Sequence, residues 1–392
     1  AHVVKRLRDA GAVILGKTNL SEWANIRSTR SVSGWSARGG LTRNPYALDR
    51  NTSGSSSGTA AALAAGLAPL GVGTETDGSI VSPASICGLV GLKPTVGRMS
   101  RDGIVPISHT QDTPGPMTRT VADAALLYAA MAGRDSADAA TSVAPADTAD
   151  GTAIALPADA LRGARLGVAR AYFTGFDEVD ALIDKAIVDL QRLGAEIVDP
   201  VDLPQPTYGD AELKVLLYEL KAGLPKYLAA FAPQAKIRTL ADVIAFDLAH
   251  QDTEMAWFRQ ELFDKAQAYG GLDAKDYLDA LAECRKGARD DGIDRVVNAH
   301  RLDALIAPTG GPAWLIDPVN GDHSVAGFSA PAAVAGYPHL TVPAGFVRGL
   351  PIGLSFVGPA WSEARLLALG QAYEQATRHR RAPTFVKRST PA

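Results

Sequence analysis

Two serine- and glycine-rich segments contain the residue types most able to do covalent chemistry. The first is Gly54–Gly58 and the second is Gly73–Ile80, which ends in Asp-Gly-Ser-Ile. A serine hydroxyl becomes a nucleophile when a neighbouring base takes its proton, and glycine lets backbone N–H groups approach a substrate closely. Serine and glycine are also common turn residues, so one such loop alone would more often be structural. The two segments therefore predict a catalytic site only in combination with other features of the sequence.

The first segment also fits the Gly-x-Ser-x-Gly pattern of α/β-hydrolase esterases. In that alternative Ser56 is the nucleophile, and Asp303 and His339 are its partners. Those enzymes need a strand that runs directly into the serine. Residues 44–53 contain Pro, Asp, Arg, Asn and Ser, which is the composition of a loop. The segment also lacks the Gly-Lys-Ser/Thr ending of a phosphate-binding P-loop.

Composition and charge argue against several other classes of protein. Cys87 and Cys284 are the only cysteines, and the seven histidines form no His-x-x-x-His pair, so we expect no metal and no cofactor. A net charge of −3 does not favour nucleic acid as a partner. No stretch is apolar enough to predict a membrane span. No signal peptide is visible, and both cytoplasm and periplasm stay open as locations.

The surrounding elements predict an α/β fold. Short apolar runs indicate strands at 12–15, 70–74, 166–169, 304–307, 340–342 and 352–357. Helical patterns occupy 59–68, 118–133, 179–193 and 362–376, and most of 210–300, with separate helices expected at 240–250 and 253–269. Residues 135–151 form a linker or surface loop by composition. We expect a mixed central sheet flanked by helices, with its core at 1–135 and 301–392 and a mostly helical cap at about 150–300.

Longer motifs around both serines resemble the amidase signature family. They occupy residues 7–22, 43–46, 73–83 and 88–95, and 336–338 and 349–353 near the other end of the chain. Within the family the chain is most similar to bacterial peptide amidases, in residues 21–25, 34–40, 111–117 and 217–223. The resemblance implies one amidase-signature domain over residues 1–392. It also implies an enzyme that removes the terminal amide from C-terminally amidated peptides and releases ammonia.

The resemblance implies a Ser–Ser–Lys triad. Ser79 would be the nucleophile, and Ser55 would be the bridging serine after a cis peptide bond, passing the proton to a neutral lysine. The backbone N–H groups of Thr76, Asp77, Gly78 and Ser79 would form the oxyanion hole. One donor of this kind typically contributes about 2.7–4 kcal/mol of transition-state stabilisation.

The chain departs from common family features beside the nucleophile. Many members carry Gly-Gly before the serine and an arginine soon after it, whereas this chain has Asp77-Gly78 and then Val81-Ser82. Without that arginine, acidic substrates are disfavoured. Asp77 could accept a hydrogen bond from a substrate N–H, or it could brace the turn. Trp35 and Tyr218 are candidates to line a peptide pocket, although buried aromatic residues more often belong to a core.

The family's lysine lies in a Lys-Asp motif farther upstream than the residues that precede Ser55 here. Lys17 and Lys93 belong to Gly-Lys-Thr-Asn and Gly-Leu-Lys-Pro-Thr motifs that look structural, and Lys5 is not a substitute. We therefore expect the chain to lack an N-terminal segment and its catalytic base. As it stands, it should be inactive or weakly active.

A second alternative is the amidase component of a tRNA-dependent amidotransferase, which supplies ammonia to a partner that acts on charged tRNA. The peptide amidase motifs and the absence of a basic surface signal argue against this alternative. The expected partner is a small amide or an amidated peptide, and the protein is expected to be a monomer or a homodimer.

Overall fold

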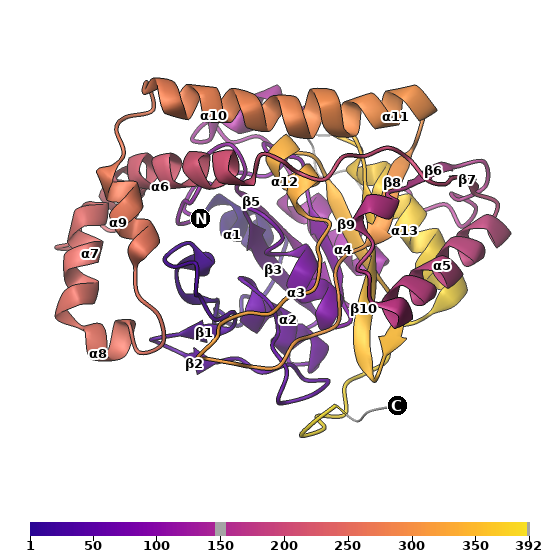
Figure 1. Cartoon of the computed structure of the whole chain (residues 1–392), viewed down its shortest axis with the longest axis horizontal. Coiled ribbons are helices and arrows are strands. Elements are labelled where there is room, and N and C mark those ends of the chain that lie inside the picture. Colours follow the sequence, from indigo (N-terminus) through magenta and orange to yellow (C-terminus); the bar gives the residue numbers. More distant parts are fainter. Residues whose placement is uncertain (146–153, 390–392) are drawn as a thin grey trace.

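A mixed sheet of eight strands lies at the centre of the computed structural model, which describes residues 1–145 and 154–389 (Figure 1). The strand order is β3-β5-β4-β9-β10-β8-β6-β7. Strand β6 pairs in parallel with β7 and β8, and the other neighbours are antiparallel. The strands are β3 (Leu70–Glu75), β4 (Val90–Lys93), β5 (Thr113–Thr118), β6 (Arg165–Val168), β7 (Glu196–Val198), β8 (Ala304–Pro308), β9 (His339–Val347) and β10 (Leu350–Val357).

The pairing of β4 with β9 joins the two ends of the chain in one sheet, as the sequence predicts. Leu92 of β4 lies opposite Leu340 of β9. Both residues are completely buried, because helices cover the sheet on both sides. The helices on and around the sheet are α1 (His2–Asp9), α2 (Ser57–Ala64), α3 (Val81–Ile86), α4 (Val121–Met131), α5 (Asp177–Arg192), α12 (Ala330–Ala335) and α13 (Glu363–Thr377).

Side-chain alternation along β8 separates the two cores. Ala304 and Ile306 pack into the core that contains α4, α5 and α13. Leu305 and Ala307 face the opposite way, into the core that contains α12. Successive strand residues point to opposite faces of a sheet, so β8 is apolar on both faces. This explains why β8 appears in the sequence as a short continuous apolar run.

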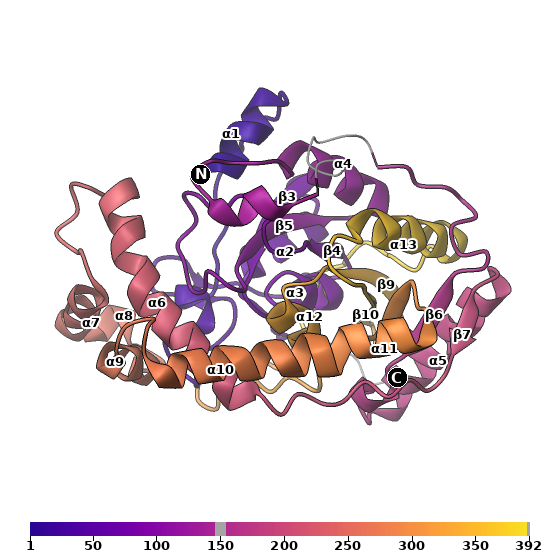
Figure 2. The same cartoon turned by 90° about the horizontal axis from the view of Figure 1, so that it is seen from above.

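A group of helices extends from one end of the sheet (Figures 1 and 2). It consists of α6 (Gly209–Phe231), α7 (Leu240–Ala249), α8 (Gln251–Glu254) and α9 (Glu261–Ala268). The chain then runs through α10 (Lys275–Arg285), a π-helical segment η5 (Lys286–Ile293) and α11 (Asp294–His300). Two short strands, β1 (Trp35–Ser36) and β2 (Gly40–Leu41), form a separate antiparallel pair.

Three expectations about these elements need correction. The mostly helical part begins at α6, because β6 and β7 belong to the central sheet and α5 packs on it. Residues 12–15 form no strand, and Val13 and Leu15 are 83% and 73% exposed. The helix expected at 253–269 is divided into α8 and α9.

Of the linker expected at 135–151, residues 139–143 form a 3₁₀ turn, and 146–151 lie outside the described residues.

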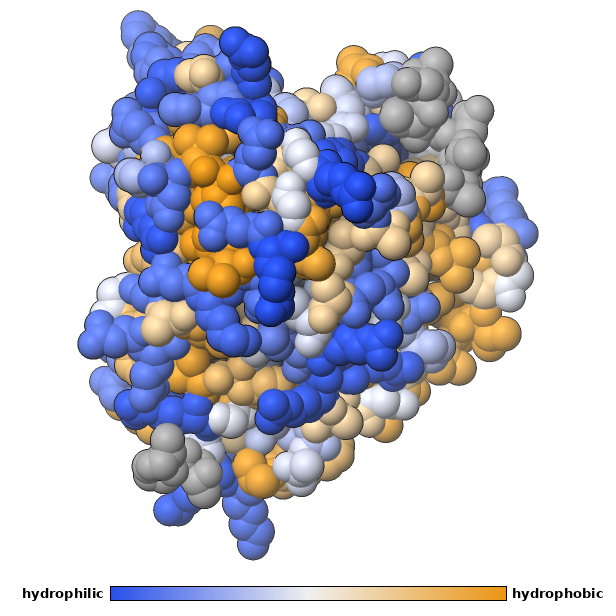
Figure 3. All heavy atoms as spheres, turned by 90° about the vertical axis from the view of Figure 1, so that its right-hand side faces the viewer, coloured by the Kyte–Doolittle hydropathy of each residue, from blue (hydrophilic) through white to orange (hydrophobic). Residues whose placement is uncertain are grey.

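The surface around α5 and β7 is largely hydrophilic, and apolar side chains gather in its hollows (Figure 3). Among the helices that the structure describes, none has the length and apolar character to cross a membrane.

Candidate active site

The two serine- and glycine-rich segments lie side by side at the starts of α2 and α3. The Ser56 N–H donates a hydrogen bond to the Ser79 carbonyl oxygen at 3.2 Å. The Gly54–Ser55 peptide bond is cis. The side chains of Ser55 and Ser79 are both buried, and neither hydroxyl forms a hydrogen bond with another described residue. Both hydroxyls are therefore free to take part in proton transfer.

The Ser21 region holds the first segment in place. The Ser21 N–H donates to the Ser55 carbonyl oxygen at 3.1 Å. The Ser57 hydroxyl donates to the Ser53 carbonyl oxygen at 2.7 Å and lies 3.0 Å from the Ser21 hydroxyl. A Cβ atom at Gly54 would lie 2.2 Å from the Ser21 Oγ atom, so a larger residue does not fit there. These contacts fix the position of Ser55.

Four consecutive backbone N–H groups in the second segment have no acceptor among the described residues. They belong to Thr76, Asp77, Gly78 and Ser79. The next two N–H groups, of Ile80 and Val81, donate to the Glu75 carboxylate at 2.7 and 3.0 Å. Unpaired N–H groups are uncommon inside proteins, and a run of such groups can bind a negatively charged oxygen.

Gly78 allows the loop to turn directly before Ser79. Its φ angle is +76°, in the left-handed region that residues with a side chain avoid. A Cβ atom at this position would also lie 3.0 Å from the Ser329 Oγ atom. Glycine is therefore required for both the backbone conformation and the close packing against α12.

Gln111 and Asp112 clamp Thr76 from the other side of the loop. The Thr76 hydroxyl donates to the Asp112 carboxylate at 2.6 Å, and the Gln111 amide donates to the Thr76 carbonyl oxygen at 3.3 Å. Burial raises the pKa of Asp112 to about 6. The sequence motif 111–117 contains these residues but does not indicate this role. The pairing of Thr113, the first residue of β5, with Glu75 of β3 places the two residues beside the loop.

Asp77 and Glu212 form a buried pair of carboxyl groups beside the same loop. The Asp77 Oδ1 atom is buried and has no hydrogen-bond partner among the described residues, and burial raises the pKa of the Asp77 carboxyl group. Glu212 accepts a hydrogen bond from the Gln111 amide at 2.9 Å. Burial and the neighbouring Asp77 carboxylate raise the pKa of Glu212 to about 8. Glu212 is therefore protonated at neutral pH, which limits the negative charge beside the loop.

The Asp77 and Glu212 pair predicts that replacement of Glu212 by glutamine changes how kcat and the thermal midpoint depend on pH. Ionisation of Glu212 above about pH 8 places a second negative charge beside the oxyanion site. We expect Glu212→Gln to reduce the alkaline loss of kcat by roughly tenfold, equivalent to about 1.4 kcal/mol. The raised native pKa also means that the stabilisation by Glu212 is complete below its ordinary value and is lost as the pH rises through about 8. The thermal midpoint of the variant should therefore depend less on pH in this window.

Rates of ammonia release and thermal denaturation between about pH 6 and 9, in a chain that includes the upstream Lys-Asp segment, test this prediction. Burial also lowers the pKa of Lys93 to about 8, so the difference between the two proteins is the relevant quantity. Identical pH profiles for both proteins would contradict the role of Glu212.

Lys93 lies in the interior below the nucleophile loop. It is completely buried, and its ammonium group donates to the Pro94 carbonyl oxygen at 3.2 Å. Burial raises the pKa of Glu75, and the charge of Lys93 opposes that rise. Lys93 therefore acts as a countercharge for the carboxylate that holds the Ile80 and Val81 N–H groups. Lys5 pairs with Asp9 at the surface.

The two aromatic residues predicted to line a substrate pocket are buried in packing contacts. Trp35 packs edge-on against Phe258. Tyr218 stacks on Tyr269, and its hydroxyl donates to the Asp276 carboxylate at 2.7 Å. Packing accounts for both side chains, so neither needs a substrate contact to explain its position.

The structure contradicts the esterase alternative. Residues 51–56 form no strand, so no strand leads into Ser56. The Ser56 hydroxyl bonds to the N–H and the carbonyl oxygen of Thr74, both at 3.1 Å. His339 bonds to Ser355, and Asp303 accepts the Arg165 N–H, so neither residue assists Ser56. Among the described residues, no group of three or more His, Cys, Asp or Glu side chains could hold a metal ion.

Comparisons with known proteins agree with this geometry. A sequence model of the family described as Amidase matches residues 1–367. A probable amidase from Arabidopsis thaliana is 40% identical over 395 residues, which cover 98% of this chain and 72% of the plant protein. The A subunit of the Symbiobacterium thermophilum glutamyl-tRNA(Gln) amidotransferase is 35% identical over 417 residues, with 97% and 77% coverage.

Solved structures of peptide amidases are also similar. The peptide amidase PAM, in complex with the competitive inhibitor chymostatin, superposes with a TM-score of 0.95 at 52% identity. The native peptide amidase from Stenotrophomonas maltophilia superposes with a TM-score of 0.93, also at 52% identity. Each match covers 98% of this chain and 78% of the solved chain.

Proposed function

The chain belongs to the amidase signature family, and from this premise we propose that it hydrolyses the terminal amide of C-terminally amidated peptides. The observation that supports this proposal most strongly is the run of four unpaired N–H groups that ends at the buried Ser79. The free hydroxyl of Ser55 lies in the adjoining loop. The two serines would supply the nucleophile and the proton relay, and the N–H groups would bind the oxyanion. The 52% identity to solved peptide amidases supports this class of substrate.

The proposed reaction has two halves. The Ser79 oxygen attacks the amide carbonyl carbon while Ser55 takes its proton and passes its own to a neutral lysine. The resulting oxyanion is held by the N–H groups of residues 76–79. The C–N bond then breaks, the leaving nitrogen takes a proton, and ammonia departs. Water attacks the acyl group on Ser79, which releases the peptide acid and restores the serine hydroxyl.

We propose that the final proton acceptor is the lysine of the family's upstream Lys-Asp motif. Lys93 is buried, donates to the Pro94 carbonyl oxygen and balances the charge of Glu75. Lys5 pairs with Asp9, and Lys17 is exposed to solvent. A serine hydroxyl alone is too weak a base to hold the proton at neutral pH. Residues 1–392 on their own would therefore carry the nucleophile, the relay and the oxyanion site without the base.

Neutral amides are the proposed substrates. Val81 and Ser82 occupy positions near the nucleophile where an arginine would bind a substrate carboxylate. Asp77 contributes a buried carboxylate oxygen without a partner among the described residues, which could accept a hydrogen bond from the substrate N–H₂ group. Such a carboxylate would repel an acidic substrate.

The substrate proposal predicts a preference between two panels of compounds. In a chain that includes the upstream Lys-Asp segment, kcat/KM for amidated dipeptides should exceed that for malonamate-type acids by about 100-fold, equivalent to about 2.7 kcal/mol. Ammonia release from both panels measures the ratio. Asp77→Asn is the matched variant. It should lower the ratio of kcat/KM for amidated dipeptides to kcat/KM for the acids, because it removes the negative charge that repels the acids. A preference for the acids would overturn the proposal.

A role in a tRNA-dependent amidotransferase is the second candidate function. Several relatives at 34–38% identity are named as A subunits of glutamyl-tRNA(Gln) amidotransferases. Under this alternative the protein would co-purify with partner subunits and RNA. Under the peptide amidase proposal it would purify as a monomer or a homodimer that releases ammonia from amidated peptides.

A further inference from the structure

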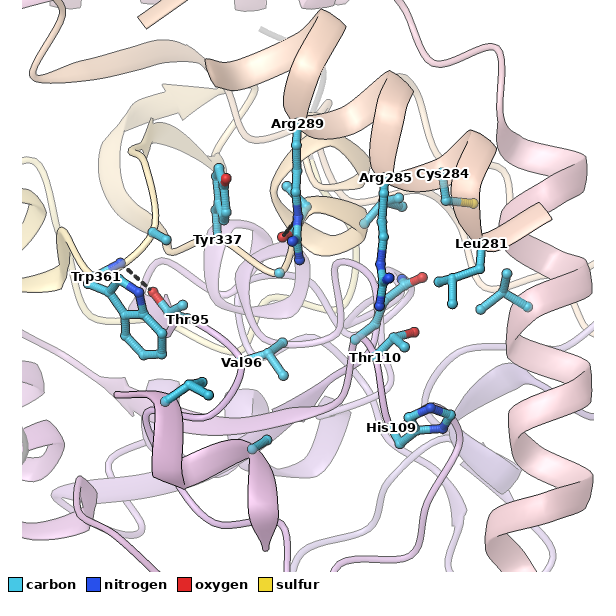
Figure 4. Close-up of a pocket in the computed structure, with 18 residues that line it drawn as sticks. Thr95, Val96, His109, Thr110, Leu281, Cys284, Arg285, Arg289, Tyr337 and Trp361 are labelled. Carbon is cyan, nitrogen blue, oxygen red and sulfur yellow. Dashed lines mark hydrogen bonds between the residues drawn. The ribbon is translucent and has the colours of Figure 1, made fainter. Parts of the chain in front are cut away.

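A cavity lies apart from Ser55 and Ser79, neither of which lines it. Its volume is about 430 Å³, and Figure 4 shows it beneath the helix that carries Cys284, Arg285 and Arg289. Small-molecule sites commonly have volumes of about 300–1,000 Å³. Helix α12 separates the two places: Ser329, before its first turn, lies beside Gly78, and Gly336, after its last turn, lines the cavity. Gln111, which bonds to Thr76, is the wall residue that connects them.

Two arginines point into this cavity from one face of the helix (Figure 4). Arg285 and Arg289 are four residues apart, so their side chains lie one above the other. The Arg289 Nε–H donates to the Ala335 carbonyl oxygen at 2.8 Å, and the guanidinium lies over the Tyr337 ring with 5.5 Å to its centroid. Within residues 1–145 and 154–389, neither arginine has a carboxylate at ion-pair distance. The cavity therefore contains uncompensated positive charge.

The nearby acidic groups already have partners. Glu219, at the His109 side, accepts hydrogen bonds from the hydroxyls of Ser108, Thr110 and Tyr277. The His109 imidazole lies 3.4 Å from the same carboxylate. At the other side, Asp294 accepts the Tyr337 hydroxyl at 2.8 Å. These contacts leave the two guanidinium groups available to a ligand.

The helix is irregular where the arginines emerge. Residues 286–293 form a π-helical segment between two α-helices, with Gly292 outside helical φ and ψ values. Segments of this kind inside α-helices frequently lie at functional sites. Arg285 is the last residue of α10, directly before the π-helical segment, and Arg289 lies within that segment.

The remaining walls are apolar and aromatic. Val96, Val215, Leu281 and Val334 contribute aliphatic surface, and Tyr337 and Trp361 contribute rings. The Thr95 hydroxyl accepts the Trp361 N–H at 2.9 Å and so fixes the tryptophan backbone at the edge of the cavity. A ligand with an anionic end and a compact apolar body matches this combination of walls and charges.

We propose that this cavity binds a small organic carboxylate with an aromatic or branched apolar body. The carboxylate would lie between Arg285 and Arg289, since a guanidinium group matches the two oxygens of a carboxylate. The apolar body would lie against Val96, Leu281 and Trp361. This proposal does not rest on the amide hydrolysis proposed above.

Calorimetric titration with benzoate tests the site, with benzyl alcohol as the neutral compound of similar shape. Wild-type protein should bind benzoate at one saturable site and bind benzyl alcohol at least about tenfold more weakly, equivalent to about 1.4 kcal/mol. The double variant Arg285→Gln/Arg289→Gln should lose at least tenfold in affinity. Lys286→Gln is the matched control, because Lys286 is on the same helix and pairs with Asp291 at the surface. Its affinity should be unchanged.

The single variant Arg285→Glu keeps the test decisive if the double variant unfolds. The Arg285 side chain is exposed and forms no hydrogen bond with a described residue, so its replacement should leave the fold intact. This variant should not bind benzoate. The proposal is overturned if wild-type protein shows no saturable benzoate binding, or if Arg285→Glu binds benzoate as tightly as wild type.

Discussion

Replacement of Ser79 by alanine should lower the rate of ammonia release by about 10⁴-fold or more, as the loss of a serine nucleophile does in other hydrolases. Ser79 lies at the end of the run of four unpaired N–H groups that would hold the oxyanion, and its hydroxyl has no other described partner. Without the hydroxyl, the N–H groups could still polarise an amide, which leaves a small residual rate. The measurement is kcat for an amidated dipeptide, in a chain that carries the upstream Lys-Asp segment.

Ser56→Ala is the matched control for this variant. Ser56 lies beside Ser55, but its hydroxyl bonds to the backbone of Thr74. Its loss should cost stability and change kcat by less than about tenfold. Ser55→Ala should resemble Ser79→Ala, because residues of one proton-transfer chain act as a unit. Activity that survives Ser79→Ala and disappears with Ser56→Ala would contradict the assignment.

Residues 1–392 alone should release ammonia about 10²- to 10⁴-fold more slowly than the same residues joined to the Lys-Asp segment of a related peptide amidase. This range is the usual contribution of a general base. Ser55 can relay a proton, but relay requires a final acceptor. The lysines of the flanking motifs do not offer one, since Lys93 is committed to the interior and Lys5 to Asp9.

Two controls separate the missing base from a change in folding. The first is the joined protein with alanine in place of the lysine of the Lys-Asp motif, which should be as slow as residues 1–392 alone. The second is thermal denaturation of each protein, which reports whether the shorter chain is folded. Equal turnover by the short and the joined chains would show that another residue is the base.

The sequence predicts five strands of the central sheet (β3, β6, β8, β9 and β10), because local signals and the final environment agree there, but it does not predict β4, β5 or β7. Runs such as 304–307 and 352–357 are apolar at most positions, and the structure buries them on both faces. The N-cap of α4 is also predictable: the Thr120 hydroxyl accepts the Asp123 N–H. The run 12–15 shows where local patterns fail, because a strand also needs a partner to pair with, and none of the described strands pairs with it.

Motif resemblance locates both serines of the candidate site but not the residues that support them. Asp112 and Gln111 hold Thr76 although they are more than thirty positions away in the sequence, and Glu212 of α6 accepts a hydrogen bond from Gln111. Such contacts depend on how strands and helices pack, and no spacing rule in the sequence encodes them. For the same reason the sequence suggests a substrate contact for Tyr218, whereas its hydroxyl bonds to Asp276 from another helix.

The most direct test of the proposed mechanism is to identify the serine that carries the acyl group during turnover. The chain with the Lys-Asp segment would be mixed with an amidated dipeptide, quenched in acid within one turnover, digested and analysed by mass spectrometry. We expect an added peptide acyl mass on the fragment that contains Ser79, and no such mass in Ser79→Ala. An acyl mass on Ser55 or Ser56, or full turnover by Ser79→Ala, would contradict the mechanism.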